Sequence, residues 1–147
     1  MLDKPFFMLY NRLRRQGKAM NYSRQRETVL SVLKSTKDHP SADWIYSECK
    51  KVIPNIGLAT VYRNLEQLVA QGKVIKVPVG QDRERYDADI SLHCHGACPV
   101  CGKVWDEDIS SPLRDSLNAE CEKNHSDGYS LTFFRVCGDC KAKQGQQ

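Results

Sequence analysis

Residues 58–71, LATVYRNLEQLVAQ, contain the most regular helical pattern in the sequence. Apolar residues recur three and four positions apart and predict one buried stripe along an amphipathic helix. They are Val61, Leu65, Leu68 and Val69. Gly72 follows, and glycine is the residue with which helices most commonly end. The stretch therefore predicts a helix that packs on a core with one face and presents the other face to solvent.

The segments around this helix predict the fold of the first half. Residues 74–79 and 84–88 are typical of two strands joined around Gly80-Gln81-Asp82, which is a hairpin. Upstream, Ser23 and Ser41 can cap two earlier helices, separated by a break at Asp38-His39-Pro40. The expected apolar faces of these two helices hold Val29, Leu30 and Leu33 in the first, and Ala42, Ile45, Tyr46, Cys49 and Val52 in the second. Three helices and a hairpin are the pattern of a winged helix, in which the last helix enters the DNA major groove.

The solvent face of residues 58–71 carries side chains that can read bases. Tyrosine can touch a thymine methyl group, arginine can bind guanine with two donors, and glutamine can pair with adenine. The candidates for DNA contact are Thr60, Tyr62, Arg63 and Gln67. Charge agrees with this interpretation, since residues 1–80 carry a net +8 and residues 81–147 a net −4. A protein-interaction module with a solvated basic surface is the alternative.

The second half predicts a small α/β unit. Residues 104–109 are typical of a strand, Ser111 and Pro112 suit the N-cap and first position of a helix, and residues 129–136 are β-prone. The helix would present Leu113, Leu117 and Cys121 on one face. We therefore predict an α+β protein with a winged-helix domain at 1–88 and an α/β domain at 89–147. Residues 1–19 form either a leading helix or an extension, because Met20 is an alternative start.

The cysteines predict a structural metal site. The longest apolar run near the N-terminus, Phe6 to Tyr10, is too short for a membrane span or a secretory signal, so we expect a cytoplasmic protein in which disulfides rarely persist. Two CxxC pairs, Cys98–Cys101 and Cys137–Cys140, can supply four thiolates to one tetrahedral Zn²⁺. Lys103, Arg135 and Lys141 are near enough in sequence to offset its negative charge. A reversible disulfide or unrelated core cysteines are the alternatives.

His93 and His95 suggest a second metal site. They flank Cys94 and share one face if the segment is extended, while Cys94 points away. Nitrogen and oxygen ligands without thiolate suit Fe²⁺ or Mn²⁺. Zinc deaminases have a glutamate two residues after the histidine, and neither histidine here has one, so we do not expect an enzyme.

Several motifs together resemble the ferric uptake regulator (Fur) family over roughly residues 20–140. They are HPSADWIY at 39–46, GLATVYRNLEQLVAQGKV at 57–74, RYD at 85–87, HCHGACPVCGKVWD at 93–106 and CGDC at 137–140. Members of this family are dimeric metal-dependent repressors with a winged-helix domain and an α/β dimerisation domain. The resemblance implies a homodimer that binds a double-stranded, palindromic DNA operator.

The resemblance also assigns residues. Cys98, Cys101, Cys137 and Cys140 match the structural zinc site, and the regulatory ligands match His39, Asp87, His93, His95 and Asp106. Aspartate at 87 and 106 is similar to the peroxide-sensing PerR branch, in which bound Fe²⁺ reacts with peroxide and oxidises ligand histidines, by position His39 and His93. The resemblance also implies that the Mn²⁺-bound form binds DNA but does not respond to peroxide. An iron- or zinc-uptake regulator of the same family and a zinc-ribbon interaction module are the alternatives.

Overall fold

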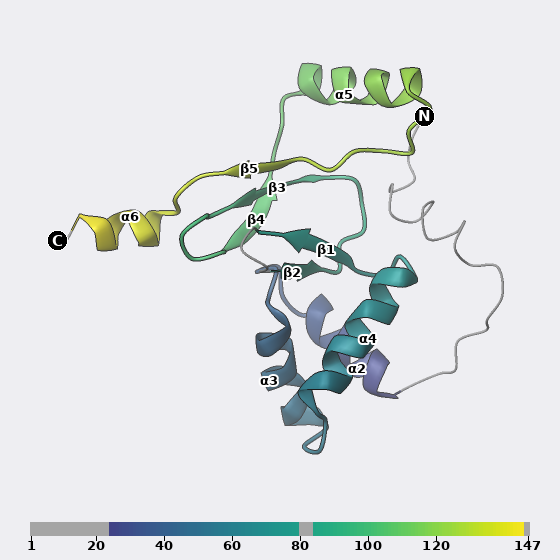
Figure 1. Cartoon of the computed structure of the whole chain (residues 1–147), viewed down its shortest axis with the longest axis vertical. Coiled ribbons are helices and arrows are strands. Elements are labelled where there is room, and N and C mark those ends of the chain that lie inside the picture. The colour runs from purple at the N-terminus through teal and green to yellow at the C-terminus, as the bar shows by residue number, and fades with distance from the viewer. Residues whose placement is uncertain (1–23, 80–83, 146–147) are drawn as a thin grey trace.

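A computed structural model describes residues 24–79 and 84–145 of the chain. The expected leading helix at 1–19, the cap at Ser23 and the turn at residues 80–82 lie outside these ranges. Three helices open the described part: α2 (Arg24–Lys34), α3 (Ala42–Val52) and α4 (Leu58–Ala70). Figure 1 shows them packed together at one end of the molecule.

The three helices enclose the larger hydrophobic core. Its buried residues come from all three helices and from the segments that follow them, namely Val29, Leu33, Ala42, Ile45, Cys49, Ile56, Val61, Leu65, Leu68, Val74 and Tyr86. The hydroxyl of Ser41 accepts a hydrogen bond from the Trp44 N–H at 3.3 Å, so the predicted cap of α3 is confirmed. The prediction that Val52 joins the apolar face is wrong, because α3 ends there and its side chain is 54% exposed.

The predicted hairpin is confirmed as β1 (Ile75–Pro78) and β2 (Glu84–Asp87), paired antiparallel. Tyr86 is buried in the helical core. On the other side of the hairpin, Val77 and Val79 pack against Ala97 and Val104 of the second half. The hairpin therefore lies between the helices and the second sheet (Figure 1).

The second half is built on a sheet with strand order β4–β3–β5. β3 (Cys94–Ala97) pairs antiparallel with β4 (Val104–Glu107) and parallel with β5 (Thr132–Phe134). Two helices complete it, α5 (Ser111–Lys123) and α6 (Gly138–Gln144), and α6 had no sequence-based prediction. Together with the winged helix, this unit confirms the predicted α+β class.

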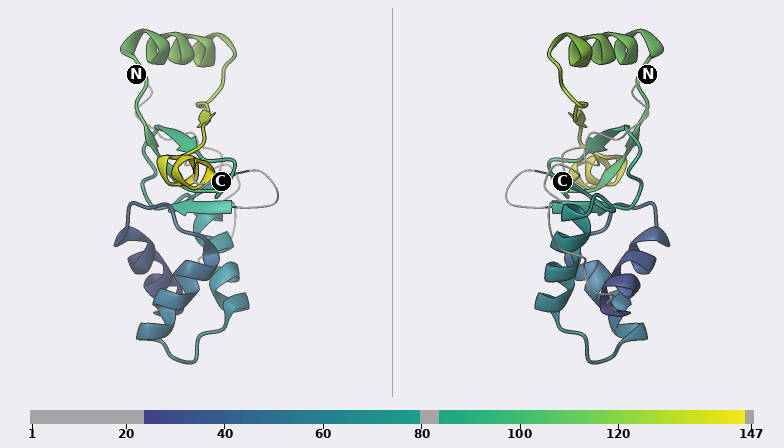
Figure 2. Two further views of the ribbon diagram at one scale, coloured as in Figure 1. Left: turned by 90° about the vertical axis from the view of Figure 1, so that its left-hand side faces the viewer. Right: turned by 90° about the vertical axis from the view of Figure 1, so that its right-hand side faces the viewer.

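Four predicted details of the second half are wrong. The strand expected at 104–109 ends at Glu107, and the strand expected at 129–136 is limited to Thr132–Phe134. Ser110 rather than Ser111 occupies the N-cap of α5, without a side-chain hydrogen bond. Of the apolar face expected on α5, only Cys121 is buried, while Leu113 is 39% exposed. Figure 2 shows the reason, since α5 stands apart from the sheet in both views.

Within the described ranges, no helix is long and apolar enough to cross a membrane.

Candidate metal centres

The four cysteines of the CxxC pairs converge on one point, with their sulfurs all within 4.8 Å of one another. Cys98 follows β3, and Cys140 lies in α6, so the cluster joins the chain end to the sheet. The Sγ atoms of Cys101 and Cys137 are 3.8 Å apart. A tetrahedral ion with Zn–S bonds of about 2.3 Å separates its sulfurs by about 3.8 Å. The donor set therefore fits Zn²⁺ in both chemistry and spacing.

The first cysteine pair forms a tight turn that favours a thiolate. Gly102 adopts φ 73° and donates its N–H to the Cys98 carbonyl at 2.9 Å, which closes the turn. Burial works to raise the pKa of Cys98, but backbone N–H groups of Cys101, Cys137 and Val100 point at its sulfur and lower the pKa to about 6. The turn thus stabilises a negatively charged sulfur through its own backbone.

The charges around the cysteines differ from the prediction. Lys103 lies 3.8 Å from Asp139, whereas Arg135 pairs with Glu107 at 2.8 Å and covers the Trp105 ring. Sequence reasoning missed Arg85 of β2, whose Nε donates to the Gly102 carbonyl at 2.9 Å. Arg85 lies 17 residues from Gly102, and only the packing of the hairpin on the second half brings the two together.

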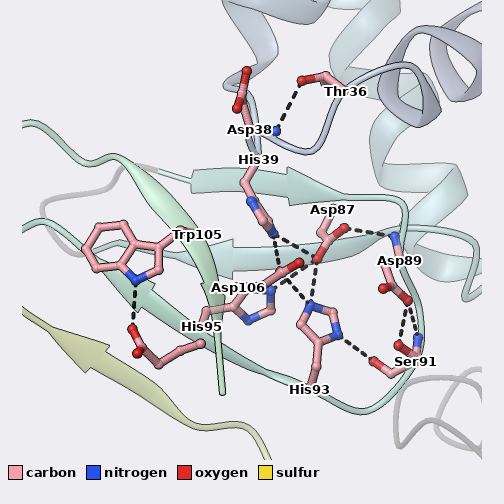
Figure 3. Close-up of polar contacts among 11 residues, drawn as sticks. Thr36, Asp38, His39, Asp87, Asp89, Ser91, His93, His95, Trp105 and Asp106 are labelled. Atoms are coloured by element: carbon pink, nitrogen blue, oxygen red, sulfur yellow. Dashed lines mark hydrogen bonds and ion pairs between the residues drawn. The ribbon is translucent and has the colours of Figure 1, made fainter.

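The histidine and aspartate candidates form a second cluster, shown in Figure 3. Oδ2 of Asp87, at the end of β2, lies 3.0–3.1 Å from one ring nitrogen of each of three histidines: His39, His93 and His95. Oδ1 of Asp106 lies 2.9 Å from His39 and 3.2 Å from His93. The cross-strand register places His95 directly opposite Asp106. All five residues singled out from the sequence therefore meet at one place.

Local backbone structure directs these side chains inward. His39 has φ 49°, in the left-handed region that histidine enters more readily than most residues. The next residue, Pro40, accepts a hydrogen bond from the Tyr86 N–H at 3.1 Å, which holds this loop against the hairpin. Only Asp106 is well exposed, at 55% of its side chain, so the cluster is open to solvent on that side.

The hydrogen bonds of His93 show that the cluster suits a cation. Its Nδ1 lies 2.8 Å from the Ser91 carbonyl, which can only accept, so Nδ1 carries the proton of the neutral ring. Nε2 then turns a lone pair toward two carboxylates. In a metal-bound histidine, the ring nitrogen that does not bind the metal usually donates its N–H to an acceptor such as a backbone carbonyl. His39 is buried, and its Nδ1 has no hydrogen-bond partner among the residues that the structure describes.

Without a metal ion, the carboxylates of the cluster favour the protonated forms of His39 and His93. The hydrogen bond to Asp87 raises the pKa of His93 to about 9, against the opposing effect of burial. Burial would lower the pKa of His39, but Asp87 and Asp106 raise it above its ordinary value. Burial would raise the pKa of Asp87, yet hydrogen bonds from three histidines hold it well below the usual range. The donor set of three imidazoles and two carboxylates fits Fe²⁺ or Mn²⁺.

Cys94 belongs to neither cluster. It is buried in β3, and burial raises the pKa of its thiol. Its position agrees with the expectation that it points away from the flanking histidines.

The predicted DNA-contact residues all lie on α4, but they differ in exposure and in hydrogen bonding. Tyr62 and Arg63 are exposed, whereas Thr60 is half-buried and accepts a hydrogen bond from Arg63 at 3.3 Å. The amide oxygen of Gln67 accepts from Arg26 of α2, with the Arg26 Nε at 3.0 Å. A two-point contact with adenine needs that oxygen, so Gln67 must leave Arg26 to make it.

Fold and site together define a winged-helix protein with two candidate metal centres. Residues 17–132 match the ferric uptake regulator family. The chain belongs to this family, whose members are metal-dependent transcriptional repressors, and the resemblance of the motifs is confirmed.

Relatives with two kinds of name are similar to the chain. A ferric uptake regulation protein of Campylobacter jejuni is 30% identical over 143 residues, which cover 93% of this chain and 89% of that protein. A peroxide-responsive repressor PerR of Staphylococcus saprophyticus is 32% identical over 124 residues, 81% of each chain. The crystal structure of a Campylobacter jejuni peroxide stress regulator is 33% identical, with a TM-score of 0.67, and covers 79% of this chain and 88% of that one.

Proposed function

We propose that this protein is an Fe²⁺- or Mn²⁺-dependent repressor that responds to peroxide through oxidation of its ligand histidines. One observation carries the proposal: the His/Asp cluster draws its five residues from both halves of the chain. His39 and Asp87 belong to the winged helix, which we assign to residues 1–88. His93, His95 and Asp106 belong to the second domain, residues 89–147.

An ion held by all five residues joins the two domains. Its binding would displace the protons that His39 and His93 attract, and would fix the angle between the winged helix and the sheet. In a homodimer this angle sets the distance between the two α4 helices. A palindromic double-stranded operator requires them about 34 Å apart, one turn of DNA. Without the ion, conformations with the correct spacing become rare, and the apparent affinity for DNA falls.

The four cysteines are proposed to hold a structural Zn²⁺. The second domain has about 60 residues, too few to bury a large core. Its buried residues are indeed a small set around Ala97 and Val104. A zinc ion bound by Cys98, Cys101, Cys137 and Cys140 would fix α6 to the end of β3 and supply the missing stability.

The dimer surface that we propose is the exposed edge of the second domain. β5 is an edge strand of its sheet, and Phe133 and Phe134 on it are 40% and 59% exposed. α5 stands away from this sheet with Leu113 exposed (Figure 2). A second copy of the chain would cover both. On DNA, Thr60, Tyr62, Arg63 and Gln67 would contact the bases, and the site of action would be the cytoplasm.

Two features favour peroxide sensing over iron or zinc uptake control. The first is that both carboxylates are aspartates, as in the peroxide-sensing branch that the motifs resemble. His39 and His93 each contact both carboxylates, whereas His95 contacts Asp87 alone. Bound Fe²⁺ would supply the reactivity toward peroxide that these side chains lack. An imidazole that gains an oxygen atom no longer fits the shared position between Asp87 and Asp106, so the site loses affinity.

Metal-dependent DNA binding before and after peroxide tests the proposal. Duplexes are first selected by the protein from a random pool, and affinity is then measured without oxygen in chelator, Fe²⁺, Mn²⁺ or Zn²⁺. We expect tight binding with Fe²⁺ and Mn²⁺, and loss after hydrogen peroxide with Fe²⁺ alone. Mass spectrometry should find one added oxygen atom on peptides that contain His39 or His93. Release of DNA without this mass change supports an uptake regulator, and chelated protein that binds as tightly overturns the proposal.

A further inference from the structure

The hairpin presents different faces to the two halves of the molecule. Side chains alternate along a strand, so Tyr86 of β2 enters the helical core while Arg85 and Asp87 lie on the opposite side. The register places Val77 opposite Arg85 and Ile75 opposite Asp87. Directly opposed residues share a face. One face of the hairpin therefore carries an apolar pair, a carboxylate and a guanidinium toward the second half.

Arg85 contacts the turn that holds the first two cysteines. Its Nε donates to the Gly102 carbonyl at 2.9 Å, and its Nη2 lies 3.5 Å from the Cys101 carbonyl. Backbone N–H groups of this turn point at the Cys98 sulfur. The Gly102 and Cys101 carbonyls face Arg85, whose planar guanidinium has enough donors to bind both.

Three contacts that the described residues of the hairpin make with the second half differ in kind. The contact of Val77 with Ala97 and Val104 is apolar. Apolar contacts are non-directional, so this one does not fix the orientation of the hairpin on the second half. Asp87 contacts His93 and His95 of the second half. All three belong to the His/Asp cluster, so this contact depends on whether a cation is bound there. Arg85 is always charged and donates to fixed backbone carbonyls. Among these three contacts, it is the directional one that does not depend on the state of the His/Asp cluster.

We propose that Arg85 is a positioning residue that sets the orientation of the winged helix from the cysteine cluster. The hydrogen bonds require the shape of the turn at Cys98–Gly102, and a zinc ion would hold that shape. The four thiolates that bind zinc would leave the site with a net negative charge near the guanidinium. The cysteine cluster then stabilises more than its own domain. Loss of zinc loosens the hairpin even when the His/Asp cluster is filled. The consequence for DNA rests on the proposed function, whereas the consequence for the hairpin does not.

Amide hydrogen exchange of the hairpin tests the placement without DNA. The zinc-loaded, full-length protein is compared with Arg85→Ala and Arg85→Lys, at equal zinc content. Loss of a charged hydrogen bond should speed exchange in residues 75–77 and 84–87 about tenfold in Arg85→Ala, with a smaller effect in Arg85→Lys. Arg135→Ala is the matched control, because Arg135 pairs with Glu107 inside the second half. Equal hairpin exchange in wild type and Arg85→Ala, or an equal increase in Arg135→Ala, overturns the proposal.

Coupling between two sites is reciprocal, and this gives a second test. Cys101 is the exposed cysteine of the cluster, so its alkylation by N-ethylmaleimide can be followed by mass spectrometry. In Mn²⁺-loaded wild type and Arg135→Ala, a selected DNA duplex should slow this reaction. In Arg85→Ala the rate should be the same with and without DNA. Equal slowing in Arg85→Ala overturns the coupling. If wild type binds no duplex, the proposed function fails, and hydrogen exchange still decides the role of Arg85.

Discussion

Replacement of Gly96 by alanine should weaken both the fold and the His/Asp site. A Cβ at Gly96 would lie 2.1 Å from Trp105 Nε1 and 2.2 Å from Cε2, far inside contact distance. Movement of the indole would break two contacts. Its N–H donates to Glu107 at 2.7 Å, and the guanidinium carbon of Arg135 lies 4.8 Å from the ring centroid. Gly96 pairs with Trp105 across β3 and β4, next to the pair of His95 and Asp106.

The magnitude follows from these contacts. Loss of one hydrogen bond costs about 1 kcal/mol, loss of an exposed cation–π contact about 0.5–1 kcal/mol, and overpacking about 1–3 kcal/mol. We expect Gly96→Ala to lower the free energy of unfolding by about 2.5–5 kcal/mol. Displacement of β4 also moves Asp106, so Mn²⁺ affinity should fall about tenfold although no ligand is changed.

Urea unfolding of the zinc-loaded protein and Mn²⁺ titration measure the two effects. Gly138→Ala is the control, because a Cβ there meets nothing within 4 Å, and it should change stability by less than about 0.5–1 kcal/mol. In a Trp105→Leu background, Gly96→Ala should cost much less, since the clashing ring is gone. If Gly96→Ala unfolds at the wild-type urea concentration and binds Mn²⁺ equally well, the reasoning is refuted.

Three further predictions concern single side chains. Ser41→Ala should lower stability by about 1 kcal/mol, because the Trp44 N–H loses its acceptor; an unchanged thermal midpoint would contradict the cap. Burial, with a smaller effect of Glu48, raises the pKa of Cys49 to about 11. Iodoacetamide at pH 8 should therefore alkylate Cys49 at least about 100-fold more slowly in folded than in urea-unfolded protein. Equal rates would argue against the buried position. Cys137→Ser should leave less than one zinc per chain and lower the thermal midpoint by more than Cys121→Ser, as Cys121 belongs to neither cluster; full zinc content in Cys137→Ser would exclude the four-sulfur site.

Local sequence patterns predicted the parts of the structure that local interactions determine. The apolar spacing of residues 58–71 gives α4, and Ser41 caps α3 because the donor it binds is three residues away. The two CxxC pairs each bring two sulfurs together through a short turn. His93 and His95 share one side of an extended segment, and both reach Asp87.

Other features depend on pairings between distant segments and could not be read from the sequence. The contact of Asp106 with His39 requires the β3–β4 register and the packing of the hairpin on the sheet. Arg85 reaches Gly102 for the same reason. Gln67 was expected to face DNA, yet Arg26 from another helix binds its amide oxygen. Leu113 of α5 stays exposed within the described part of the chain although Cys121 is buried, so periodicity alone predicted burial that a single copy provides only in part.

Anomalous diffraction from crystals of the Mn²⁺-loaded protein tests most directly whether one ion joins the two domains. We expect a manganese peak at the cluster in Figure 3, bound by ring nitrogens of His39, His93 and His95 and by carboxylate oxygens of Asp87 and Asp106. A manganese ion held by residues of the second domain alone, with His39 and Asp87 turned away from it, would contradict the account.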